Sequence, residues 1–178
     1  MLCTWARDHG ISGVGVDIST VFTDRARARA AELGVADLVF VHGDACGYVA
    51  NEPVDLAACI GATWIGGGVA GTAGTVDLLG RSLRPGGLTL IGEPYWRQEP
   101  ADQETVEACH AGSRDDFRLL PELIDRFGHL GYDVVEMLLA DQGSWDRYRA
   151  AQWLSGSTSA AGSTRTPTTS WLLTCGKS

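Results

Sequence analysis

The feature that most constrains the fold of this chain is a regular alternation of short apolar runs with longer stretches of helical periodicity. Four runs have the length and composition of buried strands, at residues 14–16, 38–41, 54–60 and 88–91. Stretches with apolar side chains at helical spacing, such as 21–33 and 75–83, lie between them. Strands that are apolar throughout and alternate with helices are typical of a mostly parallel sheet with helices on both faces. We therefore expect a doubly wound α/β fold.

The charge and cysteine content of the chain limit the kinds of molecule that it is expected to bind. The chain has 178 residues, with 14 basic and 22 acidic side chains and a formal net charge of −8. Proteins that bind nucleic acid or a membrane surface through charge need a basic face, so we expect neither partner. No apolar run is long enough to span a membrane. The five cysteines form no Cys-x-x-Cys pair, which predicts reduced thiols, no metal site and a cytoplasmic location.

The chain divides into three parts by composition. Residues 1–154 carry the strand and helix pattern and are expected to form one α/β domain. Residues 155–170 contain ten Ser or Thr residues, and such a segment buries too little apolar surface to offset its ordering entropy, so we expect it to be disordered. Residues 171–178 are expected to form an edge strand or a tail.

Residues with ligand-binding chemistry stand where the predicted strands end, which is where open parallel sheets bind their ligands. Asp17 ends the first strand, and its carboxylate can accept hydrogen bonds from both hydroxyls of a ribose. Asp44 follows the second strand and can accept from an adenine amino group, while the Ala45 amide can donate. Gly61 ends the third strand and leaves room for a ligand, and Glu93 ends the fourth.

Four segments taken together resemble successive motifs of the class I S-adenosylmethionine-dependent methyltransferases. They are Gly13-Val14-Gly15-Val16-Asp17-Ile18-Ser19, His42-Gly43-Asp44-Ala45, Val54-Asp55-Leu56-Ala57-Ala58-Cys59-Ile60-Gly61 and Leu83-Arg84-Pro85-Gly86-Gly87-Leu88. The last segment is the most specific, because this family typically turns there between a helix and a strand. The resemblance covers residues 1–139.

This resemblance implies a Rossmann-like fold, S-adenosylmethionine as cofactor and methyl transfer as activity. It also implies that Asp17 binds the cofactor ribose, Ile18 packs on the adenine, and Asp44 with Ala45 contacts the adenine edge. Gly61 would line the pocket towards the methionine end of the cofactor. The end of the sheet would be an antiparallel hairpin that includes residues 134–139.

The chain departs from the family pattern at its start. Members of the family begin with a strand and a glycine-rich loop that wraps the methionine part of the cofactor, whereas this sequence opens in the helix that follows the loop. We therefore expect an N-terminally incomplete domain that lacks the first strand and its glycine-rich loop, with unpaired backbone groups on the neighbouring strands.

The acceptor of the methyl group is expected to be a small molecule. The acidic charge disfavours nucleic acid, and the insertion at residues 97–116 has a length suited to covering a small pocket. Glu93 and Tyr95 stand near the predicted pocket, and Trp64 and Trp96 are candidates for an apolar or cation-facing wall. These four residues are the predicted substrate-binding set, and the sequence singles out no catalytic base.

Two other functions remain open from the sequence. Gly66-Gly67-Gly68-Val69-Ala70-Gly71 matches Gly-x-Gly-x-x-Gly, with Glu93 following 22 positions after Gly71, which would suit an NAD(P)-dependent oxidoreductase. The spacing is poor, because four residues separate Gly61, where the strand ends, from the first glycine of Gly66–Gly71. The second alternative is a non-catalytic, incomplete domain.

Overall fold

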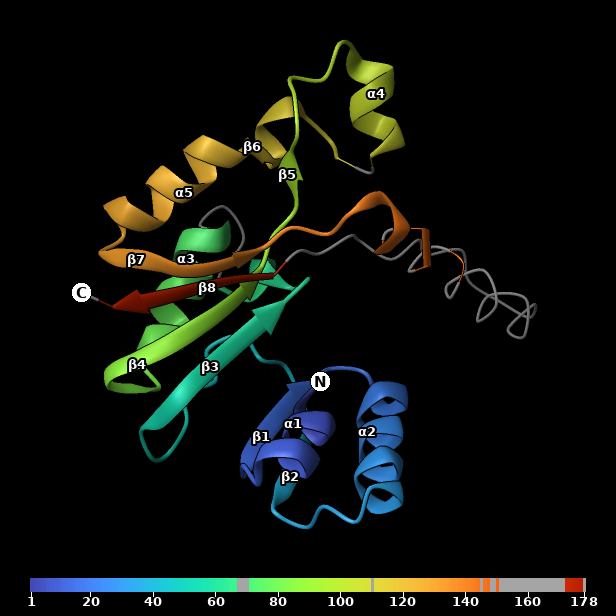
Figure 1. Ribbon diagram of the computed structural model, residues 1–178, viewed down its shortest axis with the longest axis vertical. Helices are drawn as coiled ribbons and strands as arrows, with labels where there is room; N and C mark the ends of the chain where they lie inside the picture. The colour runs from blue at the N-terminus through green and yellow to red at the C-terminus, as the bar shows by residue number, and fades with distance from the viewer. Residues whose placement is uncertain (67–70, 110, 145, 148–149, 151–171, 178) are drawn as a thin grey trace. The chain divides into compact units, whose positions relative to one another are not determined.

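The computed structural model describes residues 1–66, 71–109, 111–144, 146–147, 150 and 172–177 (Figure 1). Residue contacts divide the chain into two compact units, Met1–Tyr48 and Val49–Ser178. Each unit has its own sheet. The Ser/Thr-rich segment predicted to be disordered, residues 155–170, lies outside the described residues.

The first unit is a strand-helix-strand arrangement preceded by one helix. Its elements are α1 (Leu2–His9), β1 (Gly13–Asp17), α2 (Thr20–Glu32) and β2 (Leu38–His42). The two strands pair in parallel, with Val14 opposite Val39 and Asp17 opposite His42. The predicted order of helix, strand, helix and strand is confirmed in this unit.

Local residue chemistry explains where the helices of this unit begin and end. Gly10 stops α1 in the left-handed conformation, with φ of +64°, which glycine adopts without steric cost. Ser19 caps α2, because its hydroxyl oxygen accepts a hydrogen bond from the Phe22 amide at 3.4 Å. Glycine and serine are the residue types that commonly end and cap helices, so both features follow from local sequence.

The second unit contains the larger sheet. Its elements are β3 (Val54–Ile60), η1 (Thr63–Gly66), α3 (Gly71–Gly80), β4 (Leu83–Gly92), β5 (Tyr95–Trp96), α4 (Gln103–Ala108), η3 (Arg114–Asp116), β6 (Arg118–Leu119), α5 (Leu120–His129), β7 (Tyr132–Leu138) and β8 (Leu172–Lys177). The main sheet has the order β3-β4-β8-β7, in which β3 and β4 are parallel and β8 is antiparallel to both of its neighbours. The predicted antiparallel end of the sheet is confirmed.

The backbone of residues 172–177 corrects one detail of the prediction. This segment was expected at an edge of the sheet or as a tail, but β8 pairs with β4 on one side and with β7 on the other. It is therefore an interior strand of its sheet. Sequence pattern alone cannot place it, because its partners lie more than 30 residues earlier in the chain.

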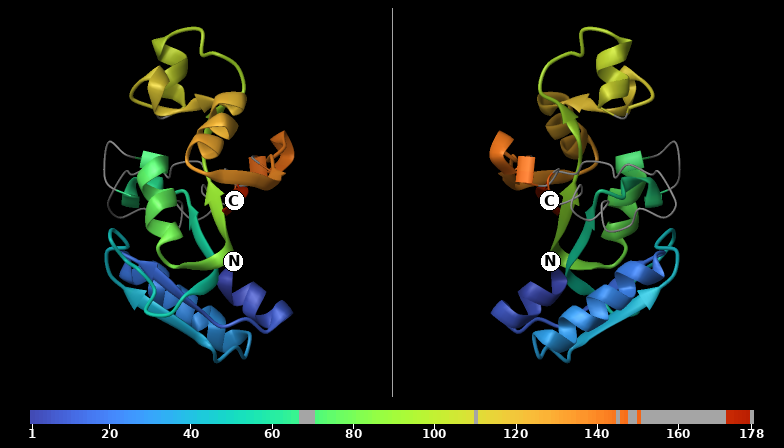
Figure 2. Two further views of the ribbon diagram at one scale, coloured as in Figure 1. Left: turned by 90° about the vertical axis from the view of Figure 1, so that its left-hand side faces the viewer. Right: turned by 90° about the vertical axis from the view of Figure 1, so that its right-hand side faces the viewer.

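One face of the main sheet carries the core. Cys59 of β3 and Ile91 of β4 pack with Val76 of α3 and with Leu123 and Phe127 of α5. Figure 2 shows α3 alongside β3 and β4. On the alternate residues of the same strands, Leu56, Ile60 and Leu88 are exposed. Leu90, on the same side of β4 as Leu88, is buried, so the second face of the sheet is exposed only in part.

The Pro-Gly-Gly segment differs from its prediction as a helix stop and tight turn before the strand. The helix already ends at Gly80, and β4 begins at Leu83, so Pro85-Gly86-Gly87 lies inside the strand. Leu83 pairs with Val54 and Leu88 with Leu56, so the four residues between them oppose the single residue Asp55. Gly86 has φ of +74°, which makes this excursion possible.

The insertion at residues 97–116 folds around a small core of its own. Trp96, Val106 and Ala111 are buried together, and Phe117 packs against them. The insertion carries α4 and η3, and the short strands β5 and β6 flank it in parallel pairing. None of these four elements was predicted, because each is too short for a periodic pattern.

None of the helices in the described ranges is long and apolar enough to cross a membrane.

Candidate functional site

Asp17 and Asp44 lie at the carboxyl end of the small sheet in the first unit. Asp17 ends β1, is half-buried, and accepts a hydrogen bond from the Ser19 amide at 2.7 Å. Asp44 follows β2 and accepts from the Cys46 amide at 2.8 Å. The Gly43 amide donates to the Asp17 carbonyl at 3.0 Å, so the two strand ends meet as predicted.

Ile18 and Ala45 are the other predicted cofactor residues of this unit. Ile18 is 70% exposed, so the residue that directly follows Asp17 in sequence offers an apolar surface. His42 Nε2 lies 3.0 Å from the Ile18 carbonyl oxygen, and the Nε2–H tautomer donates to it. Ala45 is half-buried and follows Asp44 in the turn after β2.

Gly61 lies at the carboxyl end of β3 in the second unit. Its φ is +68°, and its amide donates to the Gly92 carbonyl at 3.3 Å. This bond ties the chain leaving β3 to the last residue of β4. The positive φ explains the glycine at this point, since other residues rarely adopt it.

Glu93 follows β4 and is the buried acid of this strand end, with 5% of its surface exposed. Its Oε2 accepts a hydrogen bond from the Thr63 hydroxyl at 3.1 Å, and its Oε1 accepts one from the Thr72 hydroxyl. Within the described residues no ion pair involves this carboxylate. Two neutral hydroxyl donors therefore hold a carboxyl group that is removed from water.

Burial raises the pKa of the Glu93 carboxyl, because a charged group is costly to remove from water. The hydroxyls of Thr72 and Thr63 and the positive charge of Arg126 oppose that rise. Burial also raises the pKa of the Cys59 thiol to about 11, and the nearby Glu93 charge adds to the effect. Cys59 is thus a protonated packing residue at neutral pH.

Thr75 links η1 to α3 beside Glu93. Its hydroxyl donates to the Thr63 carbonyl at 2.6 Å and accepts from the Gly66 amide at 3.1 Å. A Cβ atom on Gly66 would lie 1.9 Å from the Thr75 nitrogen, so only glycine fits there. Close packing explains the first glycine of the Gly-x-Gly-x-x-Gly pattern, and residues 67–70 lie outside the described part of the chain.

The three predicted aromatic residues occupy different environments. Trp64, in η1, is 61% exposed. Tyr95 is half-buried and packs against the main core. Trp96 is buried, its indole N–H donates to the Arg114 carbonyl at 2.8 Å, and its ring lies 5.1 Å from that of Phe117. These contacts account for Trp96 by packing, and its place in an acceptor wall stays a prediction.

The structure divides the predicted site residues between the two units. Asp17, Ile18, Asp44 and Ala45 belong to the first, and Gly61, Trp64, Glu93, Tyr95 and Trp96 belong to the second. The sequence did not single out Thr63, Thr72 and Thr75. The sequence does place a threonine on each side of the glycine-rich stretch. It does not show that Thr63 and Thr72 contact Glu93, because they lie 30 and 21 residues from it in sequence.

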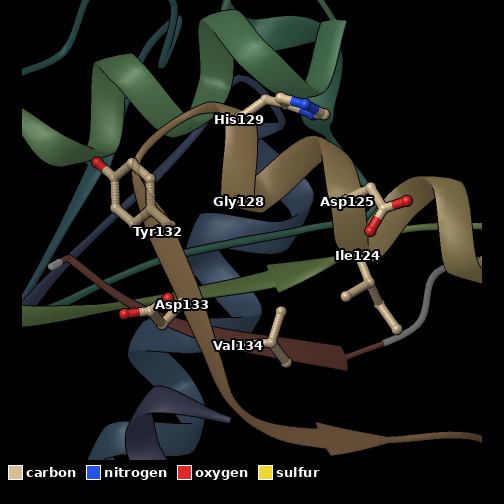
Figure 3. A pocket seen from close by; sticks show the side chains of 7 residues that line it. All are labelled: Ile124, Asp125, Gly128, His129, Tyr132, Asp133 and Val134. Atoms are coloured by element: carbon tan, nitrogen blue, oxygen red, sulfur yellow. The ribbon is translucent and has the colours of Figure 1, made fainter.

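A shallow pocket elsewhere in the second unit lies between α5 and β7 (Figure 3). Asp125 and His129 extend from the helix, and Asp133 extends from the strand. Their side chains point in different directions in Figure 3. Across the described ranges no group of three or more His, Cys, Asp or Glu side chains is arranged to hold a metal ion.

Cys3, Cys46, Cys59 and Cys109 are free thiols. That the cysteines are reduced in the cell stays a prediction.

Known proteins similar to this chain include solved structures with a bound ligand. A SAM-dependent methyltransferase from Geobacter sulfurreducens, solved in complex with S-adenosyl-L-homocysteine, is 63% identical, with a TM-score of 0.81 over 86% of this chain and 61% of that one. A SAM-dependent methyltransferase from Thiobacillus denitrificans, solved with the same ligand, is 60% identical, with a TM-score of 0.80 and the same coverage.

A curated relative gives a consistent picture. The uncharacterized protein YjhP of Escherichia coli is 62% identical over 156 residues, which are 87% of this chain and 62% of YjhP. This chain therefore spans less than two thirds of the length of the relatives that it matches. No family model matches it. The identities and the shared architecture nevertheless confirm the predicted α/β fold class: the chain belongs to the class I S-adenosylmethionine-dependent methyltransferases, with a Rossmann-like fold.

Proposed function

We propose that this chain acts as an S-adenosylmethionine-dependent methyltransferase on a small-molecule acceptor. The observation that carries the proposal is the identity of 60% or more to two methyltransferases solved with S-adenosyl-L-homocysteine, the demethylated form of the cofactor. The acidic net charge of −8 and the folded insertion at residues 97–116 support a small molecule rather than a nucleic acid. The expected cytoplasmic location stays a prediction.

The chemistry of the first unit fits the adenosine part of this cofactor. Asp17 carries a carboxylate at a strand end, and a carboxylate offers only acceptor sites, which suits two ribose hydroxyls. Ile18 presents an exposed apolar side chain, which suits the face of an adenine ring. Asp44 and Ala45 supply an acceptor and a backbone donor for the adenine edge. We assign cofactor binding to these four residues and to Gly61.

The candidate residues for binding the methyl acceptor all belong to the second unit. The bound cofactor supplies a methyl group on a positively charged sulfur. The chain contributes by holding the acceptor in line with that methyl group and by excluding water, which together lower the barrier substantially. We assign Trp64, Glu93, Tyr95 and Trp96 to the acceptor side of the site, with Trp64 as the residue that offers an exposed aromatic surface.

Calorimetric titration with S-adenosyl-L-homocysteine tests the cofactor assignment. We expect Asp17→Asn and Asp44→Asn each to weaken binding at least about tenfold, since each removes a charged acceptor from a hydrogen bond with the ligand. Asparagine keeps an oxygen that accepts from the Ser19 or Cys46 amide, so the local turn is preserved.

Asp37→Asn is the matched control. Asp37 is exposed and lies just before β2, at the opposite end of the same small sheet. The same chemical change there should leave the affinity unaltered. Failure of the unmodified chain to bind the ligand, or equal affinity in all three variants, would contradict the proposal.

A further inference from the structure

We propose that Glu93 is a positioning residue that holds η1, and with it Trp64, at the carboxyl end of β4 through the hydroxyls of Thr63 and Thr72. The inference rests on the proposed function, because it concerns the part of the second unit assigned to the methyl acceptor. It goes beyond that function by giving Glu93 a role through other residues instead of through contact with the acceptor.

The carboxyl group of Glu93 connects three elements that are separate in sequence. Glu93 directly follows β4, Thr63 is the first residue of η1, and Thr72 is the second residue of α3. Each carboxyl oxygen accepts from one of the two hydroxyls. One side chain thus fixes the start of η1 and the start of α3 to the end of the same strand.

A second set of contacts makes η1 and α3 a single rigid piece. Thr75 is fully buried, and its hydroxyl bonds to both ends of η1, at the Thr63 carbonyl and the Gly66 amide. The backbone of Gly66 lies so close to Thr75 that no side chain fits between them. Glu93 therefore acts on a preassembled piece, and its two bonds add a polar tie to the apolar contacts of Val76 and Ile65 with the core.

The hydrogen bonds of Glu93 and Thr75 hold the backbone on which the exposed Trp64 side chain lies. Trp64 lies in the middle of η1, directly after the residue that donates to Glu93, and 61% of its surface is exposed. An exposed indole costs free energy in water, and here its backbone is held at both ends of η1. Trp96, by comparison, is buried in a core and needs no such support. The tie to Glu93 thus serves the exposed aromatic residue beside the strand ends.

A carboxyl group buried at this position costs free energy unless its two oxygens accept hydrogen bonds. A buried carboxylate loses its hydration, and each hydroxyl donor recovers part of that loss. The positive charge of Arg126 of α5 favours the ionised form of Glu93, and the Glu93 charge in turn disfavours ionisation of Cys59 of β3. Replacing Glu93 by an apolar side chain would leave the Thr63 and Thr72 hydroxyls without this acceptor and remove the side-chain hydrogen bond between η1 and the end of β4.

Fluorine NMR of the full chain labelled with 5-fluorotryptophan tests the inference. The Trp64 resonance is assigned by its loss in Trp64→Phe. We expect Glu93→Leu to shift and broaden this resonance towards its position in the urea-unfolded chain. Thr72→Val removes the hydroxyl donor that is not next to Trp64 in sequence. It should move the resonance in the same direction by a smaller amount.

The conservative variant and a surface control complete the set. Glu93→Gln should keep the resonance close to its original position, because the amide oxygen accepts from one hydroxyl and the amide nitrogen donates to the other. Glu136→Leu makes the same change as Glu93→Leu at an exposed position of β7 and should leave Trp64 unaffected. A general loss of stability of the second unit would also alter the resonance of Trp96, which is buried in a core of the same unit.

The inference fails if Trp64 keeps its resonance in Glu93→Leu and Thr72→Val while both retain a cooperative unfolding transition. If Glu93→Leu does not fold, Thr72→Val decides the question by itself. Titration of the same samples with S-adenosyl-L-homocysteine separates the two hypotheses. A ligand that does not bind the unmodified chain overturns the proposed function, whereas a Trp64 resonance insensitive to Glu93 and Thr72 overturns the positioning role.

Discussion

Glu93 shows how a single residue can couple protonation to stability in this chain. Its carboxyl group is buried, and burial raises its pKa above the ordinary value of 4.5. Above that ordinary value the unfolded chain loses the proton, while the folded chain still holds it. The unfolded state then binds fewer protons, so the free energy of unfolding falls as the pH rises through this window.

We therefore expect Glu93→Gln to gain stability relative to the unmodified chain as the pH rises from about 4 towards neutrality. Glutamine keeps the shape of the side chain but does not titrate, so the loss described above disappears from the variant. Urea unfolding at a series of pH values measures the difference.

Glu136→Gln is the control for this prediction at the residue scale. Glu136 is exposed on β7, and its replacement should give a difference in stability that stays nearly constant with pH. A difference for Glu93→Gln that is equally flat, or that falls with rising pH, would show that burial does not raise the pKa of this carboxyl.

At the scale of elements, the close approach of η1 to α3 leaves less room for a Cβ atom at Gly66 than there is at any other glycine position that the structure describes. A methyl group on Gly66 would lie 1.9 Å from the Thr75 nitrogen and 2.1 Å from the Gly74 carbonyl carbon. These are backbone atoms, so they cannot rotate away as a side chain would. The two elements must separate to accommodate any larger residue.

We expect Gly66→Ala to lower the free energy of unfolding by about 3 kcal/mol, at the upper end of the cost of overpacking a core. Gly128→Ala provides a control of opposite sign, since Gly128 lies in α5 and a Cβ atom there meets nothing within 4 Å. Alanine should stabilise that helix by about 0.5–1 kcal/mol. Denaturant unfolding measures both, and a Gly66→Ala variant as stable as the parent would contradict the structure of this contact.

At the scale of the whole molecule, the two units differ in the size of their cores. The buried side chains of the first unit are small, namely Cys3, Ala6, Thr23 and Ala30. The second unit fully buries Phe127, Ile91 and Val76. Because hydrophobic stabilisation grows with the apolar area removed from water, the first unit has less of it per residue.

Hydrogen exchange should reveal this difference as unequal protection. We expect the amides of β1 and β2 to exchange about tenfold or more faster than those of β3 and β4. Saturating S-adenosyl-L-homocysteine should slow exchange in β1 and β2, since a ligand at a hundredfold excess over its Kd adds about 2.7 kcal/mol. Mass spectrometry of peptic fragments measures both effects, and equal protection of the two units would contradict the first expectation.

Strongly patterned elements were predictable because their signals are local. The Ser19 cap and the Gly10 stop each depend on a residue within one turn of the helix that it ends or begins. The apolar run at β3 appears in the structure with the predicted limits. By contrast, β5 and β6 have two residues each and exist only because they pair with one another.

The sequence by itself determined the α/β alternation and the acids at or just after the ends of β1, β2 and β4, because strand ends and helix caps depend on neighbouring residues. Only the tertiary structure decided the environment of each acid. Asp17 and Asp44 are bound by amides two residues away and remain in a strand-end turn. Glu93 is buried by contacts with Thr63 and Thr72, which lie 30 and 21 residues away. Burial and pKa depend on such distant partners, and these come together only when the sheet and α3 have packed.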